Sequence, residues 1–171
     1  MKTRDTFIAA FIVLLLGVLG WLWFSPSGLQ RAPDLSFKNV EGETIALQQL
    51  QGRPVLVTFW ATSCPGCIKE MPHLIEMYDE LAPRGLEIIG VAMDYDPPNH
   101  VMRMREERNI PYPIVLDVDS EIADAFGDVK LTPSHFLINP QGRIVHHKIG
   151  ELDMDKMHDR IETMLASQAK G

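Results

Sequence analysis

Two cysteines placed between a buried strand and a helix constrain the fold of this chain more than any other feature. Cys64 and Cys67 follow residues 54–60 (PVLVTFW), an apolar and β-branched run that predicts a central strand covered on both faces. Residues 65–81 then carry apolar side chains at helical spacing, and residues 86–93 (LEIIGVAM) return as a second buried strand. This order predicts a right-handed βαβ unit with the cysteines at its first strand-to-helix junction.

The rest of the pattern predicts one α/β domain. Strands at residues 35–37 and 44–47 form an expected N-terminal hairpin, and strands at 135–138 and 144–149 form a second one around the turn NPQG. The other expected elements are a strand and three helices, at residues 114–116, 100–108, 121–126 and 154–165. A chain of 171 residues that is 46% hydrophobic and 23% charged is typical of a globular protein. Its net charge of -7, without a basic stripe, argues against a nucleic-acid partner.

The N-terminal segment predicts a membrane anchor. Residues 7–24 contain no charged side chain, and as a helix they would rise about 27 Å, enough to cross a bilayer core. Lys2 and Arg4 precede this run, and Trp21 and Trp23 lie near its end, as in a helix with a cytoplasmic start. We therefore expect a single-pass protein of the inner membrane with its domain on the extracytoplasmic, periplasmic side.

This interpretation divides the chain into four parts. Residues 1–6 are a cytoplasmic N-terminus, 7–24 the transmembrane anchor, 25–32 a linker and 33–171 the folded domain. A cleaved signal peptide is an alternative, but the apolar run is longer than usual for one and lacks a good cleavage site. A buried core helix is a weaker alternative because the run has no polar face.

The spacing of the two cysteines predicts redox chemistry. Cys64 falls at the N-cap of the helix and Cys67 at its third position, with Pro65 at the first position, where no N–H is needed. The backbone N–H groups of Gly66 and Cys67 can therefore point at the Cys64 sulfur and favour its thiolate, with a helix-dipole contribution of up to about 2 kcal/mol. Cys64 is then the expected nucleophile, and Cys67 the thiol that resolves the mixed disulfide.

Two other uses of the cysteine pair stay open. One is half of a zinc or Cu(I) site, although zinc needs two further ligands and the chain has no second cysteine pair. The other is an inert local disulfide. The redox interpretation is favoured because cysteines three positions apart cannot join distant segments.

Three strings together resemble the TlpA/ResA-like branch of the thioredoxin superfamily. They are FWATSCPGCIKEMP around the cysteines, Thr132-Pro133, and FLINPQGRIV after it, and the resemblance covers roughly residues 33–165. It implies a thioredoxin fold with an N-terminal hairpin, a helix and strand inserted after the second core strand, and an extracytoplasmic location. It also implies that the Thr132–Pro133 bond is cis and lies against the cysteines, where the Thr132 backbone can pair with a client peptide.

The resemblance also assigns a role to Glu70, one turn beyond Cys67. In relatives an acidic residue at this place tunes the protonation of the cysteines, so Glu70 is expected to accept the Cys67 proton. The alternative from the residues alone is a solvated carboxylate in the first helical turn. Two departures stand out: Ser63 replaces an aromatic residue, and Thr58 stands where cytoplasmic thioredoxins have a buried Asp. His135 is expected to be a hydrogen-bonded core histidine without a catalytic role.

The expected function is that of a thiol:disulfide oxidoreductase that reduces disulfides in extracytoplasmic proteins, without a cofactor other than the Cys64–Cys67 disulfide and without a metal. By resemblance, the leading client is apocytochrome c during its maturation, and a membrane thiol reductant of the DsbD/CcdA type re-reduces the pair. The same motif could instead act as a disulfide oxidant. A Cu(I)-binding or delivery protein and a peroxiredoxin-like peroxidase are further alternatives.

Overall fold

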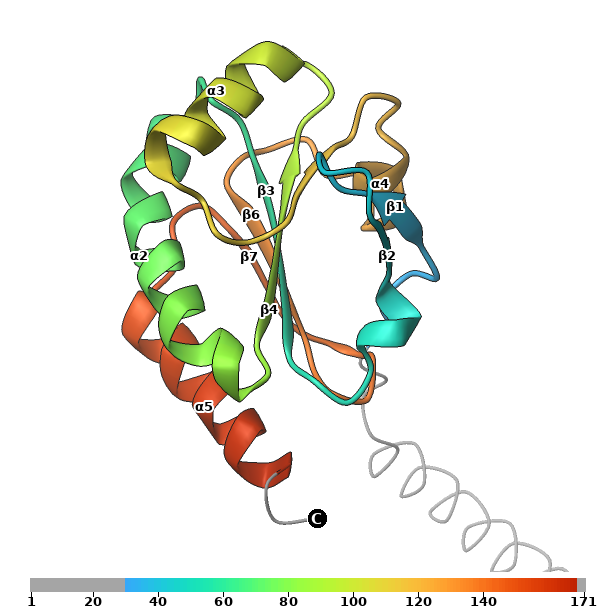
Figure 1. Ribbon diagram of the computed structural model, residues 1–171. Helices are drawn as coiled ribbons and strands as arrows, with labels where there is room; N and C mark the ends of the chain where they lie inside the picture. Colours follow the sequence, from blue (N-terminus) through green and yellow to red (C-terminus); the bar gives the residue numbers. More distant parts are fainter. Residues whose placement is uncertain (1–29, 169–171) are drawn as a thin grey trace, which may run out of the picture.

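The computed structural model describes residues 30–168, which form one α/β unit built on a five-stranded sheet (Figure 1). The strand order across this sheet is β5-β4-β3-β6-β7. Its strands are β3 Val55–Trp60, β4 Glu87–Ala92, β5 Ile114–Leu116, β6 Ser134–Ile138 and β7 Ile144–Ile149. Strands β3, β4 and β5 run parallel, whereas β6 is antiparallel to both of its neighbours, β3 and β7. The predicted βαβ unit and C-terminal hairpin are confirmed.

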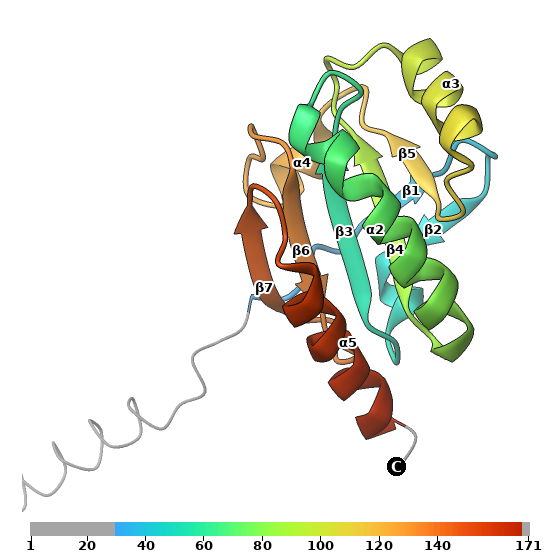
Figure 2. The same ribbon diagram turned by 90° about the vertical axis from the view of Figure 1, so that its left-hand side faces the viewer.

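Three helices cover one face of the sheet, and a short helix and a hairpin cover the other (Figures 1 and 2). The first face carries α2 Pro65–Leu81, α3 Pro98–Arg108 and α5 Met154–Gln168. The second carries α4 Glu121–Ala125 and the antiparallel hairpin of β1 Ser36–Lys38 and β2 Thr44–Ala46. Two short 3-10 helices complete the unit, η1 Leu47–Leu50 and η2 Ala82–Arg84.

Strand β3 lies in the middle of the sheet and is buried along its whole length, as its sequence predicts. Trp60 belongs to the core that α2 and α5 cover, whereas Val57 and Phe59 belong to the core on the α4 side. In this second core the Phe59 ring packs edge-on against Phe126 and Phe136, with ring centroids 5.5 and 5.8 Å apart. Because both faces of β3 are packed, the strand is a rigid base for the cysteine segment that follows it.

The element bounds differ from the predicted ones mainly at the ends of helices. Helix α3 begins at Pro98, two residues before the predicted start, because a proline at the first helical position lacks only an N–H that the helix does not use. Helix α4 ends before the predicted Phe126, and Gly127 follows with a φ of 97°. Helix α5 continues to Gln168, beyond the predicted residue 165.

The predicted cytoplasmic N-terminus, the predicted transmembrane anchor and most of the predicted linker lie outside the described residues. Within residues 30–168, no helix combines the length and the apolar character that crossing a membrane requires.

The first described residues join the sheet at the end opposite the cysteines. The Ala32 N–H donates to the Gly142 carbonyl at 2.9 Å, and the Ile144 N–H donates to the Gln30 carbonyl at 2.8 Å. Ile144 pairs with Ile138 of β6, which in turn pairs with the first residue of β3. The six extended residues of β3 span about 17 Å, and Cys64 lies beyond the far end of this strand. The chain therefore enters the domain far from the redox pair.

Candidate active site

Cys64 and Cys67 form a disulfide at the start of α2, with an S–S distance of 2.15 Å. Cys64 is the N-cap residue in an extended conformation, and its sulfur accepts the Cys67 N–H at 3.2 Å. Its carbonyl accepts the first helical N–H, from Ile68. Both cysteines are largely buried, with exposed fractions of 7% for Cys64 and 4% for Cys67, but exposed Ser63 and Pro65 flank Cys64. The predicted N-cap geometry is confirmed for the Cys67 amide.

The Thr132–Pro133 peptide bond is cis, as the resemblance implies, and Pro133 lies against the cysteine motif. A Cβ atom added to Gly66 would lie 3.5 Å from Pro133 Cδ, so the lack of a side chain at Gly66 allows this close approach. The Gly150 N–H donates to the Pro133 carbonyl at 2.8 Å and holds the other side of the proline. The segment of the predicted substrate-binding residues Thr132 and Pro133 thus adjoins the motif.

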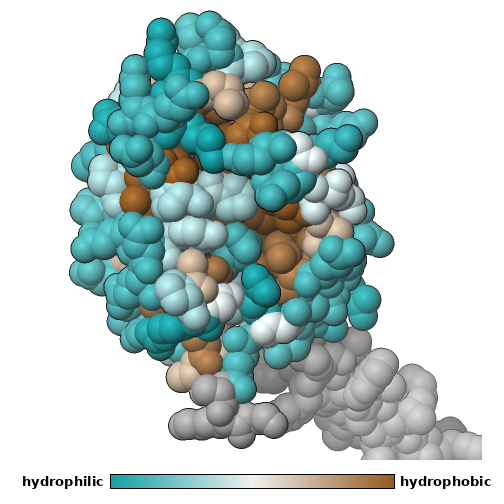
Figure 3. All heavy atoms as spheres, in the orientation of Figure 1, coloured by the Kyte–Doolittle hydropathy of each residue, from teal (hydrophilic) through white to brown (hydrophobic). Residues whose placement is uncertain are grey.

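Apolar side chains are exposed next to this proline. Of the four large hydrophobic side chains exposed in residues 30–168, three lie near Thr132–Pro133: Tyr95, Leu131 and Ile149. The Tyr95 hydroxyl lies 3.2 Å from the Thr132 hydroxyl, Leu131 directly precedes Thr132, and Ile149 pairs with Ser134. The face drawn in Figure 3 is mainly hydrophilic, with apolar residues in separate patches. We call Tyr95, Leu131 and Ile149 the apolar rim.

Glu70 is buried, with an exposed fraction of 4%, so the alternative of a solvated carboxylate is wrong. Its Oε1 accepts the Leu152 N–H from the β7–α5 loop at 2.8 Å. Its Oε2 lies 3.1 Å from Nε2 of His135 on β6. Cys67 and Glu70 are three positions apart on α2, so the two residues are neighbours on the helix surface.

His135 departs from its expected role. Its side chain has no exposed surface and lies in the core, as predicted, but neither ring nitrogen makes a hydrogen bond within residues 30–168. The Glu70 Oε2 also lacks a hydrogen bond, so the 3.1 Å contact with Nε2 is close but poorly aligned for one. His135 pairs across the sheet with Thr58, the position that carries a buried Asp in cytoplasmic thioredoxins. The contact between His135 and Glu70 could not be predicted from the sequence, because β6 and α2 are distant in the chain.

Two aromatic residues, Tyr112 and Trp60, lie in the core on the α2 side of the sheet. Burial raises the pKa of the Tyr112 hydroxyl far above its usual value, and the negative charge of Glu70 raises it further. Trp60 packs in the same core, as predicted, and its indole N–H is buried without a hydrogen-bond partner within the described chain. A Cβ on Gly90 would lie 3.2 Å from both the Trp60 Nε1 and the Tyr112 ring, so these two side chains flank one point of β4.

A buried carboxylate fixes the segment just before the cysteines. Asp96, in the loop after β4, accepts the Thr62 N–H at 2.5 Å and the Thr62 hydroxyl at 2.6 Å. These bonds join positions 34 apart in the chain and hold the start of the motif against the β4–α3 loop. Nothing in the local sequence distinguished Asp96 from the neighbouring, exposed Asp94.

On the solvent side, an ion pair spans α2 and the β7–α5 loop beside the motif. The Lys69 ammonium lies 2.6 Å from the Glu151 carboxylate, whose hydrogen bond and charge raise the pKa of Lys69. A Cβ on Gly66 would lie 3.6 Å from Glu151 Cγ, so Glu151 also borders the cysteine loop. Because both partners are well exposed, the pair contributes little to stability.

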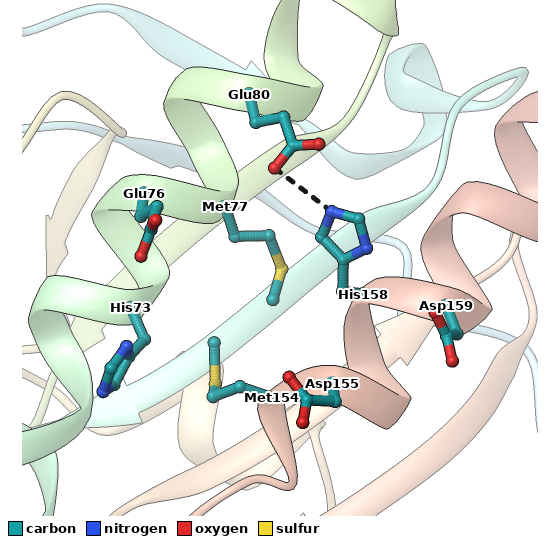
Figure 4. Close-up of a pocket in the computed structure, with 8 residues that line it drawn as sticks. All are labelled: His73, Glu76, Met77, Glu80, Met154, Asp155, His158 and Asp159. Atoms are coloured by element: carbon teal, nitrogen blue, oxygen red, sulfur yellow. Dashed lines mark ion pairs between the residues drawn. The ribbon is translucent and has the colours of Figure 1, made fainter.

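An open depression lies elsewhere, between α2 and α5 (Figure 4). This cavity of about 470 Å³ is lined by imidazole, carboxylate and thioether side chains, at His73, Glu76, Met77, Glu80, Met154, Asp155, His158 and Asp159. His158 Nε2 already lies 3.3 Å from the Glu80 carboxylate. Across residues 30–168, no group of three or more His, Cys, Asp or Glu side chains is arranged to hold a metal ion.

Comparison with known proteins gives one consistent family. The model described as the AhpC/TSA family matches residues 29–147. Two relatives are each called "Thiol-disulfide oxidoreductase ResA". The one from Halalkalibacterium halodurans is 34% identical over 133 residues, which cover 78% of this chain and 74% of the relative. The one from Bacillus subtilis is 30% identical over 179 residues, covering 99% of each chain.

A solved structure supports the same fold. The thioredoxin-family thiol:disulfide interchange protein from Chlorobium tepidum superimposes with a TM-score of 0.75 over 82% of this chain and 99% of its own, at 24% identity. The predicted thioredoxin-like α/β fold is therefore confirmed for the described residues, with the N-terminal hairpin β1–β2 and the inserted α3 and β5 in their expected places.

The contacts of Asp96 predict its effect on stability. Replacement by Ala should lower the free energy of unfolding by about 1–3 kcal/mol, because the half-buried Thr62 N–H and hydroxyl lose their acceptor. Urea unfolding of the oxidised protein measures this, with Asp94→Ala as the matched control, expected to stay within about 0.5 kcal/mol of the wild type. Equal losses in the two variants would contradict the role given to Asp96.

Proposed function

This chain belongs to the AhpC/TSA family and is a thiol-disulfide oxidoreductase of the ResA type, and we propose that it reduces disulfide bonds in extracytoplasmic proteins. The observation that carries this proposal is the position of the Cys64 sulfur at the N-cap of α2, where it accepts the Cys67 N–H. In the reduced protein this bond and the helix dipole favour the Cys64 thiolate. Cys67, held within disulfide distance, is ready to resolve what Cys64 captures.

The reaction runs through two exchanges. The Cys64 thiolate attacks one sulfur of a client disulfide, which breaks that bond, joins Cys64 to the client and releases the other client sulfur as a thiolate. Cys67 then gives its proton to Glu70 and attacks the Cys64 sulfur. This closes the Cys64–Cys67 disulfide and releases the second client sulfur, so two electrons have passed to the client. A membrane dithiol of the DsbD/CcdA type returns two electrons by the same exchange in reverse.

The surroundings of the pair fit a peptide client. The apolar rim of Tyr95, Leu131 and Ile149 offers an exposed apolar surface beside cis-Pro133, where the Thr132 backbone can pair with an extended client segment. Among such clients we favour apocytochrome c, whose haem-attachment motif C-x-x-C-H presents two cysteines on one short stretch. The resemblance of the cysteine motif to the TlpA/ResA-like branch supports this choice.

The protein is proposed to act from the outer side of the inner membrane, tethered by residues 7–24. A reductant in an oxidising compartment needs a supply of electrons, and a tether keeps it close to a membrane donor. The described chain enters the sheet at Gln30–Ala32, at the end opposite Cys64. An anchor before this point would leave the redox pair directed away from the tethering point and free to meet clients.

Trapping in cells tests the client and the division of labour. Cys67→Ala in the full-length chain should accumulate mixed disulfides on Cys64, because nothing then resolves them, and secreted C-x-x-C-H proteins should be among the trapped partners. Mass spectrometry of the captured complexes identifies them. The matched variant Cys64→Ala should capture none. If Cys64→Ala captured clients and Cys67→Ala did not, the assigned roles would be wrong.

The direction of the reaction and the competing activities are tested on the purified full-length protein. Equilibration with glutathione should require a strongly reducing mixture to keep the pair reduced, and the reduced protein should cleave insulin disulfides. A pair that stays reduced in mildly oxidising glutathione would identify an oxidant. Rapid peroxide consumption would identify a peroxidase instead, and loss of insulin reduction on addition of Cu(I) would favour the copper-binding alternative.

Fractionation of cells tests the tether. The full-length protein should sediment with membranes and be degraded by protease added to spheroplasts, whereas a chain lacking residues 7–24 should do neither, because it stays in the cytoplasm. A soluble, shortened product in the periplasm would show that the segment is a cleaved signal peptide.

A further inference from the structure

The contact between His135 and Glu70 is buried and polar, and the two exchange steps use only its Glu70 side. Three buried polar atoms of these two residues make no hydrogen bond in the described chain: Glu70 Oε2 and both ring nitrogens of His135. The histidine is fully buried, the carboxylate nearly so, and 3.1 Å separates Oε2 from Nε2. Buried polar groups are almost always paired in folded proteins, so an unpaired acid and base in contact need an explanation.

We infer that His135 is a positioning residue which directs Glu70 toward Cys67 and shares with Glu70 the proton that Cys67 loses. This inference rests on the proposed function, because it concerns the step in which Cys67 resolves the mixed disulfide. It goes beyond the role of Glu70 alone: the acceptor is a pair of groups from α2 and β6, not one carboxylate.

The hydrogen bonds of Glu70 make it dependent on a second partner. Its Oε1 is occupied by the Leu152 N–H, which can only donate, so that oxygen already has a fixed acceptor role. The Oε2 is the oxygen left to take a proton, and His135 Nε2 is the polar atom beside it. A histidine there can donate to an ionised carboxylate or accept from a protonated one, because each ring nitrogen can carry or lack a proton.

The proton can be followed through one turnover. In the reduced protein Cys64 is a thiolate and Cys67 a thiol. When Cys67 attacks the Cys64–client bond, its proton passes to the pair, the Cys64–Cys67 bond forms, and the client sulfur leaves as a thiolate with the bonding electrons. When a dithiol donor later reduces the Cys64–Cys67 disulfide, the Cys67 sulfur takes the proton back. The pair therefore stores one proton for as long as the disulfide persists.

Other charged groups face the pair from the surrounding elements. Tyr112 lies within the field of Glu70 on the α3–β5 side, and Cys67 shares α2 with Glu70. Lys148 on β7 is the cross-strand neighbour of His135 on β6. Burial lowers the pKa of His146 on β7, and the charges of Arg160 on α5 and of His135 lower it further. Glu70 is thus the negative group beside His135, with positive groups on the β7 and α5 side, so a shared proton belongs between Oε2 and Nε2.

The experiment separates the two exchange steps in the full-length protein with glutathione disulfide as the probe. Formation of the Cys64–glutathione mixed disulfide is measured in a Cys67→Ala background, and its resolution is measured with Cys67 present, both by acid quench and mass spectrometry from pH 5 to 9. His135→Leu should leave formation unchanged but slow resolution at pH 6 on the order of tenfold. In His135→Leu the resolution rate should rise with pH, because Cys67 then has to lose its proton to solvent before it attacks.

Two further variants keep the test decisive. His135→Gln keeps a donor toward Glu70 Oε2 but cannot titrate, so it should fold like the wild type and show the same altered pH profile as His135→Leu. Glu70→Gln should give that profile too, and combining it with His135→Gln should add nothing, because the two residues act as one unit. Additive losses would overturn the inference.

The contact between His158 and Glu80 offers a matched control. His158 Nε2 lies 3.3 Å from Glu80 Oε2 in the open groove between α2 and α5, away from the cysteines (Figure 4). His158→Gln should leave both steps and their pH profiles unchanged. If the His135 variants also resolve like the wild type, the inference is wrong while the proposed function stands. If the wild type itself forms no mixed disulfide on Cys64, the proposed function fails instead.

Discussion

The hydrogen bond from the Cys67 N–H to the Cys64 sulfur is the interaction on which the rest of the active site depends. It exists because β3 ends at Trp60, with only three residues between it and Cys64, and α2 begins immediately after Cys64, with Pro65 at the first helical position. A strand packed on both faces gives this junction a fixed base, and the junction places one sulfur where backbone N–H groups and the helix dipole favour its negative charge. The chemistry then requires a neighbouring thiol that can lose a proton, and that thiol is Cys67, one turn inside α2.

Around this junction, buried polar groups connect segments that are distant in the chain. Asp96 ties Thr62 to the β4–α3 loop, and Glu70 ties α2 to the β7–α5 loop through the Leu152 N–H, across 82 positions. Glu70 therefore joins two elements from a position three residues beyond Cys67 on α2. His135 reaches the same carboxylate from β6. In the proposed reaction this structural link is also the proton acceptor, so one buried side chain serves both purposes.

The sequence predicts most of the fold and the reactive pair, because both follow from local patterns. The apolar run of β3, the helical spacing in α2 and the turn between β6 and β7 each specify their element within a few residues. The redox role of the cysteines was predictable because both stand at a strand-to-helix junction. The partners of Glu70 and Asp96 could not be predicted, since they depend on how distant elements pack. The sequence around His135 predicts only a core histidine, whereas the packed sheet places it opposite Thr58 and beside Glu70.

The most direct test of the account is the pH dependence of alkylation of the two cysteines in the reduced, full-length protein, followed by peptide mass spectrometry. If the start of α2 stabilises the Cys64 thiolate, Cys64 should react first, and half of its maximal rate should appear well below pH 8.5, about where an ordinary thiol ionises. Cys67 should react later and only at higher pH. A Cys64 that titrates like an ordinary thiol, with Cys67 reacting first, would contradict the central claim.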